Sequence, residues 1–332
     1  MEDQKIRWGI ISTAKIARKK VIPGINKTTN NEVTAICSRD LAHAKSVASE
    51  LGIPKAYGSY EELLEDENID AVYNPLPNHL HVSWAVKAIE AGKHVLCEKP
   101  LGMDASDAAQ LLHKSKEHPN LKVMEAFMYR FHPQWVKTKS LVDSGALGTV
   151  RTIQAAFTYH NVDANNIRNM ADIGGGGLMD IGCYCISFSR FLFGEEPKRA
   201  VGLLDFDPKL ITDRIASGLL EYADGKSSNF TCSTQLMPYQ RCLVLGTEGY
   251  IEIEIPVNAP EDQPTRLNYV SKHGSETITF DTADQYELQA DAFAKSILSN
   301  SAVPTPLEDA VGNMKVIDAI FESGKSKRWI NI

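Results

Sequence analysis

Three residues of this chain have reactive side chains at positions that could face a bound ligand: Lys99, Asp180 and Tyr184. Lys99 follows the apolar run 95–97, which is typical of a strand buried on both faces of a parallel sheet. Ligands of open α/β sheets bind beyond the carboxyl ends of such strands, so Lys99 is expected to face a ligand crevice. The alternative is a solvated lysine before a proline turn.

Asp180 and Tyr184 are spaced i, i+4 in a helix that is predicted to begin near residue 178, after the glycine run 174–177. Positions with this spacing lie on one helix face, so both side chains should point into the same space; the alternative is a surface hydrogen bond.

The elements that would position Lys99 follow an alternating pattern. Strand-like segments are predicted to alternate with helices and to lie at 6–11, 32–37, 70–74, 95–97 and 121–125. This alternation predicts a doubly wound parallel sheet. One of the helices is expected at 79–91, capped by Asn78 and stopped by Gly92, and another near 104–117.

The turn after the first strand is a candidate phosphate-binding turn. A dinucleotide fingerprint would place glycine at positions 12, 14 and 17, where this chain has Ser12, Ala14 and Ala17. These small side chains still let a pyrophosphate approach the backbone. The alternative is a tight strand-to-helix turn without a ligand.

The second strand ends in Ser38 and Arg39, about where a dinucleotide site contacts the adenosine ribose. An arginine there suits a 2′-phosphate, whereas a carboxylate suits a 2′-hydroxyl, so these two residues favour NADP. Asp40 lies one position further on. If its side chain turns inward toward the ribose, NAD is the alternative cofactor. Arg39 could also be simply solvated.

Three segments together resemble one known family: the strand-turn-helix start, the Pro-Leu-Pro-Asn-x-x-His segment from Pro75 to His81, and the tripeptide Glu98-Lys99-Pro100. At these intervals the chain resembles the glucose-fructose oxidoreductase/inositol dehydrogenase (Gfo/Idh/MocA) family. The resemblance implies an N-terminal Rossmann domain, a C-terminal domain with a large open sheet, and NAD(P)-dependent oxidation or reduction of a sugar-like alcohol. The all-glycine fingerprint that is usual in the family is missing.

The family's second-domain helix normally reads Asp-x-x-x-His, with the histidine as proton donor or acceptor. This chain has Tyr184 at the histidine position, four residues after Asp180. That departure resembles the branch with glucose-fructose oxidoreductase, dimeric dihydrodiol dehydrogenase and NADP-dependent D-xylose dehydrogenase, where a tyrosine serves. The resemblance therefore implies Lys99, Asp180 and Tyr184 as the catalytic group, with Tyr184 as the base. Tyrosine has an ordinary pKa of about 10, so a tyrosine base needs a nearby positive charge, for which Lys99 is the obvious source. Asp180 would orient the substrate or the tyrosine, or hold Lys99 in place, and no metal is required.

The predicted binding residues combine these positions with matches to the family. The glycine run 174–177, which admits a ligand closely or merely connects elements, lies beside some of them. For Arg130 an inter-domain ion pair is the alternative, and for His81 a capping or packing role. Cofactor binding is expected from Ser12, Thr13, Ala14, Lys15, Ile16, Ser38, Arg39, Pro75, Leu76, Asn78, His81, Glu98, Lys99 and Arg130, and substrate binding from Lys99, Tyr159, Arg168, Asp180 and Tyr184.

The second half is expected to form a mostly antiparallel sheet. Strand patterns occur at 149–160, 216–221, 226–235, 241–246 and 250–255, and helices are expected at 285–298 and 308–321. We therefore predict an α/β protein with a Rossmann NAD(P)-binding domain at 1–125. A substrate-binding and oligomerisation domain is expected at 126–332, with room for the C-terminal helix to pack back on the first. The resemblance implies a homodimer or homotetramer through the C-terminal sheet.

Composition narrows the class of protein. The 332 residues are 43% hydrophobic, and 35 basic against 42 acidic residues give a net charge of −7 without a basic block, which argues against nucleic acid. The six cysteines show no zinc spacing, and no apolar run approaches the length of a membrane span. A cytoplasmic protein is expected.

The sequence thus predicts an NADP-dependent oxidoreductase acting on a sugar or cyclic-diol hydroxyl, of the D-xylose or aldose 1-dehydrogenase type or the trans-dihydrodiol dehydrogenase type. A reductase of a keto-sugar or anhydro-sugar would use the same residues. A cofactor-binding regulator without turnover is the alternative from another class, and the presence of Lys99 and Tyr184 argues against it.

Overall fold

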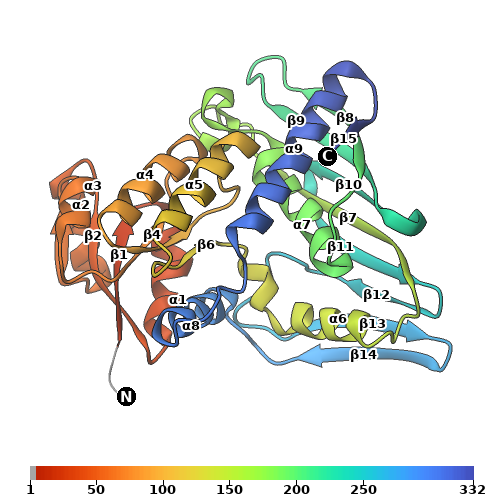
Figure 1. Cartoon of the computed structure of the whole chain (residues 1–332), viewed down its shortest axis with the longest axis horizontal. Coiled ribbons are helices and arrows are strands. Elements are labelled where there is room, and N and C mark those ends of the chain that lie inside the picture. The colour runs from red at the N-terminus through yellow and green to blue at the C-terminus, as the bar shows by residue number, and fades with distance from the viewer. Residues whose placement is uncertain (1–4) are drawn as a thin grey trace. The chain divides into compact units, whose positions relative to one another are not determined.

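A computed structural model of the chain describes residues 5–332, so the first four residues of the predicted 1–125 domain lie outside it. The described chain forms two compact units. The first contains the residues up to Met128 together with Asp284–Val311, and the second contains Tyr129–Ala283 and Gly312–Ile332. Each unit has its own sheet (Figure 1).

The sheet of the first unit is parallel throughout, and within the described residues its strand order is β3-β2-β1-β4-β5-β6. This is the Rossmann order, with a crevice where the order reverses between β1 and β4. The strands are β1 (Ile6–Ile11), β2 (Asn31–Cys37), β3 (Lys55–Tyr57), β4 (Ala71–Asn74), β5 (His94–Cys97) and β6 (Val123–Glu125). The predicted parallel sheet is therefore confirmed.

Helices connect these strands. A π-helical segment, Ala17–Val21, leads into the first of them, and α4 and α5 pack side by side (Figure 1). The helices are α1 (Ile22–Lys27), α2 (Leu41–Leu51), α3 (Tyr60–Glu65), α4 (Asn78–Glu90) and α5 (Ala105–Glu117). The predicted cap of α4 is wrong: Pro77 holds the N-cap position and Asn78 is the first helical residue. Proline is preferred near helix starts because its fixed φ suits them.

Helix α8 (Gln285–Leu298) completes the first unit although it follows the second sheet in sequence. It packs against α1, where a Cβ on Gly24 would lie 2.8 Å from the backbone nitrogen of Glu287. The ring of Phe293 lies 5.7 Å from that of Trp8 on β1. Trp8 is fully buried, and its indole N–H donates to Asn31 Oδ1 at 2.7 Å.

The second unit is built on a larger, mostly antiparallel sheet. Its order in the described residues is β14-β13-β12-β11-β7-β10-β9-β8-β15, and only β7 and β10 run parallel. The strands are β7 (Val150–His160), β8 (Arg199–Phe206), β9 (Asp213–Glu221), β10 (Ser227–Ser233), β11 (Gln235–Gly246), β12 (Gly249–Ile253), β13 (Thr265–Ser271), β14 (Gly274–Phe280) and β15 (Ile330–Asn331). The predicted fold class is confirmed.

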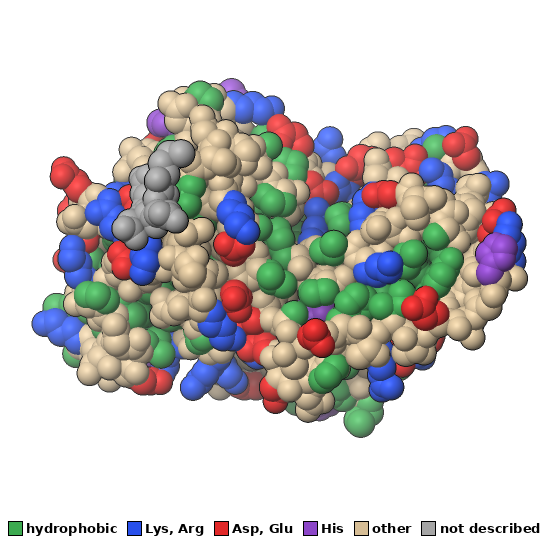
Figure 2. All heavy atoms as spheres, turned by 90° about the horizontal axis from the view of Figure 1, so that it is seen from below, with side chains coloured by type: hydrophobic (Ala, Val, Ile, Leu, Met, Phe, Trp, Pro, Cys, Tyr) green, Lys and Arg blue, Asp and Glu red, His purple; other side chains and the backbone are tan. Residues whose placement is uncertain are grey.

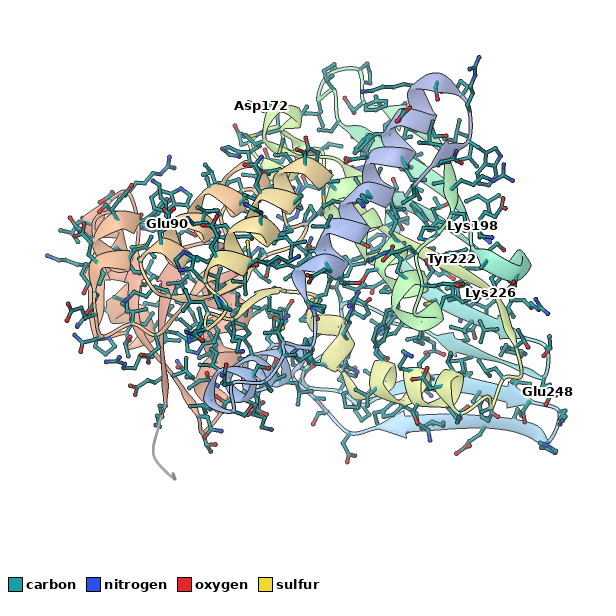
Figure 3. The ribbon with its side chains drawn as sticks, viewed as in Figure 1. Glu90, Asp172, Lys198, Tyr222, Lys226 and Glu248 are labelled. Carbon is teal, nitrogen blue, oxygen red and sulfur yellow. The ribbon has the colours of Figure 1, made fainter. Side chains whose placement is uncertain are left out.

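Helices cover one face of this sheet. Helix α7 (Cys183–Phe193) packs on β7 and β10, and the hydroxyls of Ser189 and Tyr222 share a hydrogen bond of 2.7 Å (Tyr222 is labelled in Figure 3). Helix α9 (Leu307–Ser326) lies over β8 and β9, where Ile320 contacts Gly202. Helix α6 (Pro133–Asp143) begins with a proline, whose fixed φ suits the first helical position.

The surface agrees with the mixed charge of the sequence. On the face drawn in Figure 2, the described acidic and basic side chains are interspersed rather than gathered into a block of one sign. Among residues 5–332, no helix is both long and apolar enough to cross a bilayer.

Candidate active-site residues

The turn after β1 keeps the backbone conformation of the glycine fingerprint without the glycine. Ser12 has φ +86°, a left-handed value that L side chains rarely adopt and glycine adopts readily. Its Oγ accepts a hydrogen bond from the Ala14 N–H at 3.3 Å. Ser12, Thr13 and Ala14 are only partly buried, and Lys15 is exposed. The turn therefore offers small side chains and a helix start, which fit a pyrophosphate.

After β2, the two residues that could contact the ribose, Arg39 and Asp40, have different surroundings. Asp40 is the N-cap of α2, and its Oδ1 accepts from the N–H groups of Ala42 at 2.9 Å and His43 at 3.2 Å. Its carboxylate is thus committed to the helix start. Arg39 is exposed, and no residue of the described range 5–332 forms a hydrogen bond or ion pair with it. This arrangement fits a 2′-phosphate better than a bare 2′-hydroxyl.

The loops after β4 and β5 are joined by His81. Its ring is 1% exposed, with Nε2 at 2.6 Å from the Leu76 carbonyl and Nδ1 at 2.8 Å from the Pro100 carbonyl. Asn74 adds a second tie, because its amide donates to the His81 carbonyl at 3.0 Å. The loop that contains Lys99 is therefore anchored to the loop that contains Leu76.

The two neighbouring carbonyls and the burial of the ring have opposite effects on the protonation of His81. Two carbonyls at these distances would suit a ring with a proton on each nitrogen. Burial lowers the pKa of His81 to about 4, and the charge of Lys99 contributes in the same direction. At neutral pH the ring is therefore neutral and donates to only one carbonyl at a time. This structural role accords with the packing alternative, and the expected contact with the cofactor stays a prediction.

Lys99 lies directly after β5, as predicted, and its neighbour Glu98 is fixed by β4. The Tyr73 hydroxyl donates to Glu98 Oε1 at 2.6 Å, and the Lys99 backbone N–H donates to Glu98 Oε2 at 3.3 Å. Both contacts hold the start of the loop at the carboxyl edge of the parallel sheet, where ligands of such sheets bind.

In the second unit, three predicted substrate residues form one cluster. The Tyr159 hydroxyl donates to Asp180 Oδ2 at 2.7 Å, and Arg168 Nε lies 3.1 Å from each carboxylate oxygen of Asp180. Burial, followed by the charge of Asp180, raises the pKa of Tyr159 well above its ordinary value. Tyr159 is therefore a persistent hydrogen-bond donor. The Asp180 side chain remains 12% exposed and that of Arg168 46%.

Tyr184 lies in the first turn of α7 and is 5% exposed. Its ring meets those of Tyr129 and Phe157 edge-on, at centroid distances of 6.0 and 6.1 Å. The segment Leu178–Gly182, which contains Asp180, is π-helical. A π turn pairs residues five apart, so the i, i+4 argument does not apply unchanged here. The shared face of Asp180 and Tyr184 stays a prediction.

Arg130 is held within the second unit. Its Nη2 donates to Ser187 Oγ at 2.7 Å, and its guanidinium lies 5.0 Å from the ring centroid of Phe191. Its predicted cofactor contact and the alternative inter-domain ion pair both stay untested. Ser187 was missed by the sequence argument, although a serine in the apolar helix segment 183–193 is a detectable signal.

Asp213 was also missed. It is buried at the start of β9, and its Oδ2 accepts from the Leu178 N–H at 2.7 Å, immediately before Asp180. Thirty-five residues separate donor and acceptor, so no local motif announces the contact.

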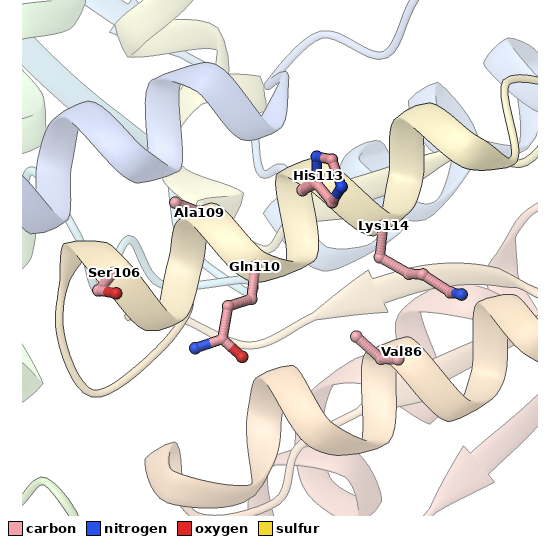
Figure 4. A pocket seen from close by; sticks show the side chains of 6 residues that line it. All are labelled: Val86, Ser106, Ala109, Gln110, His113 and Lys114. Carbon is pink, nitrogen blue, oxygen red and sulfur yellow. The ribbon is translucent and has the colours of Figure 1, made fainter.

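A groove between α4 and α5 contains none of the predicted site residues. Figure 4 shows its lining side chains, which are Val86 of α4 and Ser106, Ala109, Gln110, His113 and Lys114 of α5. Among the described residues, no group of three or more His, Cys, Asp or Glu side chains is arranged to hold a metal ion.

A parallel sheet of this order, with a glycine-like turn after β1, defines a dinucleotide-binding protein. The profile described as "Oxidoreductase family, NAD-binding Rossmann fold" matches residues 6–127, and that of the GFO/IDH/MocA C-terminal domain matches residues 135–252. The chain belongs to the GFO/IDH/MocA oxidoreductase family. The predicted family and enzyme class are confirmed.

Several members resemble the chain over nearly its whole length. It is 43% identical to an uncharacterized oxidoreductase of Rhizobium meliloti over 98% of both chains. It is 39% identical to a D-xylose 1-dehydrogenase (NADP(+)) of Haloferax volcanii over 96% of this chain and 97% of the relative, in agreement with the predicted branch. A 3-ketoreductase from Actinomadura kijaniata, solved with NADP and TDP-benzene, superposes with a TM-score of 0.90 at 30% identity, covering 96% of this chain and 98% of that one.

We expect His81→Leu to lower the free energy of unfolding by about 1–3 kcal/mol, because the substitution leaves the buried carbonyls of Leu76 and Pro100 without their shared donor. Urea unfolding measures the effect. His79→Leu, at an exposed position of the same helix, is the control and should change stability by less than about 0.5 kcal/mol. Equal stability of the two variants would show that the His81 bridge is not needed.

Proposed function

We propose that the chain is an NADP-dependent oxidoreductase that transfers hydride between the nicotinamide and a hydroxyl-bearing carbon of a sugar or cyclic diol. The proposed reaction is of the D-xylose or aldose 1-dehydrogenase type or the trans-dihydrodiol dehydrogenase type. The observation that carries the proposal is the 39% identity, over 96% of this chain, with a D-xylose 1-dehydrogenase that uses NADP(+). The exposed Arg39 beside a helix-capping Asp40 supports NADP over NAD.

The first unit would bind the cofactor and the second the substrate, which retains the expected division near residue 125. NADP supplies the hydride acceptor when bound. In oxidation, Tyr184 takes the proton of the substrate hydroxyl, and Lys99 supplies the positive charge that favours the deprotonated tyrosine. Asp180, with Tyr159 and Arg168 on its carboxylate, orients the substrate. Arg130 and the remaining predicted contacts complete the cofactor site.

A second candidate is reduction of a keto-sugar by the same residues. It is favoured by the resemblance to the 3-ketoreductase from Actinomadura kijaniata, which shares the fold over 96% of this chain. Following NADPH absorbance with a panel of aldoses, inositols, dihydrodiols and keto-sugars distinguishes the two. If the protein turns over none of these compounds, the proposed function is contradicted. The alternative of a cofactor-binding regulator without turnover then remains.

We also propose a cytoplasmic homo-oligomer that assembles through the outer face of the second sheet. The six cysteines are buried thiols, which suits a reducing compartment. Strand residues that alternate with the positions under α9 point outward, among them Leu203, 69% exposed, and Leu219, 39% exposed. Exposed apolar side chains on an open sheet are typical of an interface.

If this interface exists, Leu203→Glu should shift the protein toward the 36.7-kDa monomer in light scattering, because a charge would be buried without a partner. Leu298→Glu, at an exposed position of the first unit, is the matched control and should leave the mass unchanged. A monomeric parent protein would refute the assembly.

Arg39→Ala is expected to raise KM for NADP⁺ about 10- to 100-fold, because a charge-assisted contact to the 2′-phosphate is lost. KM for NAD⁺ should change by less than about twofold, since NAD lacks that phosphate. Initial rates with both cofactors test this, with Lys45→Ala, an exposed α2 residue, as the control. An equal loss with both cofactors would remove Arg39 from the phosphate site.

Tyr184→Phe keeps the ring and removes only the hydroxyl, so kcat for oxidation should fall about 10²- to 10⁴-fold while cofactor affinity stays near that of the parent. In the parent, the oxidation rate should rise with pH as the tyrosine loses its proton. That limb should be absent from the variant.

Two further variants separate the roles. Tyr159→Phe should keep the alkaline limb, because the raised pKa of Tyr159 already excludes it as the base. Lys99→Met should abolish turnover while cofactor binding persists, because the reaction needs the positive charge of the ammonium group and not the aliphatic part of the side chain. A Tyr184→Phe enzyme with full rate and an unchanged limb would transfer the role to another group, such as His160, the last residue of β7.

A further inference from the structure

Asp213 caps a helix that is remote from it in sequence. It is the first residue of β9 and is 1% exposed. Its Oδ2 accepts from the Leu178 N–H at 2.7 Å, and the nearby N–H of Gly177 also favours the charged carboxylate. Helix starts leave their first N–H groups without intrahelical partners, and the segment from residue 178 has no side-chain cap of its own. A carboxylate from another strand therefore closes this helix start.

The glycine run explains how Asp213 comes so close. Gly176 has φ +124°, and a Cβ there would lie 2.0 Å from Asp213 Oδ1. On the other side of the run, a Cβ on Gly175 would lie 2.7 Å from the Arg168 carbonyl oxygen, which accepts from the Gly176 N–H at 2.8 Å. The run therefore packs against protein rather than admitting a ligand. It fixes the helix start and the Arg168 loop together.

The surroundings of Asp213 are negative or neutral. Asp180 approaches from the π-helical turn, Tyr159 from β7 and Cys232 from β10, while Arg214, the next residue, pairs with a carboxylate of β8. Burial raises the pKa of Asp213 to about 7, the charge of Asp180 adds to the increase, and the backbone N–H donors oppose it. Its charge therefore changes in the neutral range.

We propose that Asp213 is a positioning residue for the reaction: its charged carboxylate holds the start of the helix that carries Asp180 and Tyr184. The inference rests on the proposed function of those two residues. A charged acceptor binds N–H donors more strongly than a neutral one and is attracted to a helix N-terminus. Protonation of Asp213 loosens the helix start, and a small displacement of reacting groups lowers the rate steeply.

The test compares Asp213→Asn with the parent between pH 5 and 9, using NADP⁺ and the panel substrate with the highest kcat/KM. The parent's kcat should rise with pH through a midpoint near 7. The variant should lose that limb and run about 10- to 100-fold slower at pH 8, with KM for NADP⁺ within about twofold of the parent. Asp205→Asn, an exposed carboxylate on the adjacent strand, is the control and should keep the limb.

Stability provides an arm that is independent of turnover. A carboxyl whose pKa is raised on folding contributes stability below its unfolded pKa and loses that contribution as pH rises through about 7. The midpoint of thermal unfolding of Asp213→Asn, minus that of the parent, should therefore increase from pH 5 to pH 8. A residue needed only for folding would lower stability and rate together at high pH.

Three outcomes overturn the inference: a parent without an acid limb between pH 6 and 8, a variant that retains the limb, or a variant with the parent's kcat. Should Asp213→Asn fail to fold, Asp213→Ser, which keeps a small neutral acceptor, is tested in the same way. Loss of rate in Tyr184→Phe with no effect in Asp213→Asn rejects only the Asp213 proposal. No turnover of any panel substrate rejects the proposed function and, with it, a role of Asp213 in the reaction, while the stability arm still shows whether Asp213 changes its charge near pH 7.

Discussion

The contact on which the first unit's candidate site depends is the one between the His81 ring and two backbone carbonyls. Both carbonyls belong to loops that leave the carboxyl edge of the parallel sheet, one after β4 and one after β5. Loops at that edge normally have much freedom, and a functional lysine needs a defined place. A buried ring that ties the two loops together restricts that freedom with a single side chain. Lys99 therefore stands on a loop fixed by its neighbours, not by its own contacts alone.

The second unit solves the same problem with a carboxylate. Asp213 links β9 to the helix start at Leu178, as His81 links the loops that follow β4 and β5. Burial lowers the pKa of His81 and raises that of Asp213, and both shifts favour the uncharged side chain. For His81 the neutral ring keeps one donor and satisfies one carbonyl. For Asp213 the charged carboxylate is the stronger acceptor for the N–H groups of the helix start, but burial disfavours this charged form near neutral pH.

Local signals predicted much of the fold. The predicted strand 6–11 and helix 285–298 match β1 and α8 residue for residue, because apolar periodicity and flanking turn residues mark both. Strands β8, β13 and β14 were not predicted, because their mixed exposed residues lack a clear alternation. The candidate site shows the same difference between residues with a local sequence signal and residues without one. The position of Lys99 after a strand could be predicted, and its functional role stays a prediction, whereas Asp213 contacts Leu178 across 35 residues and leaves no local pattern.

Tyr159 and Tyr184 show why the surroundings of a side chain decide its chemistry. Both phenols lie in the second unit, where Tyr159 was predicted to bind substrate and Tyr184 to accept the proton. Tyr159 already donates to Asp180, and removing its proton would set two negative charges 2.7 Å apart in a buried place, so its proton is retained. Its hydrogen bond, with that of Arg168, fixes the carboxylate instead. Because the Tyr159 hydroxyl is engaged by Asp180, Tyr159 orients that carboxylate, and the proton acceptor that we propose is Tyr184 of α7.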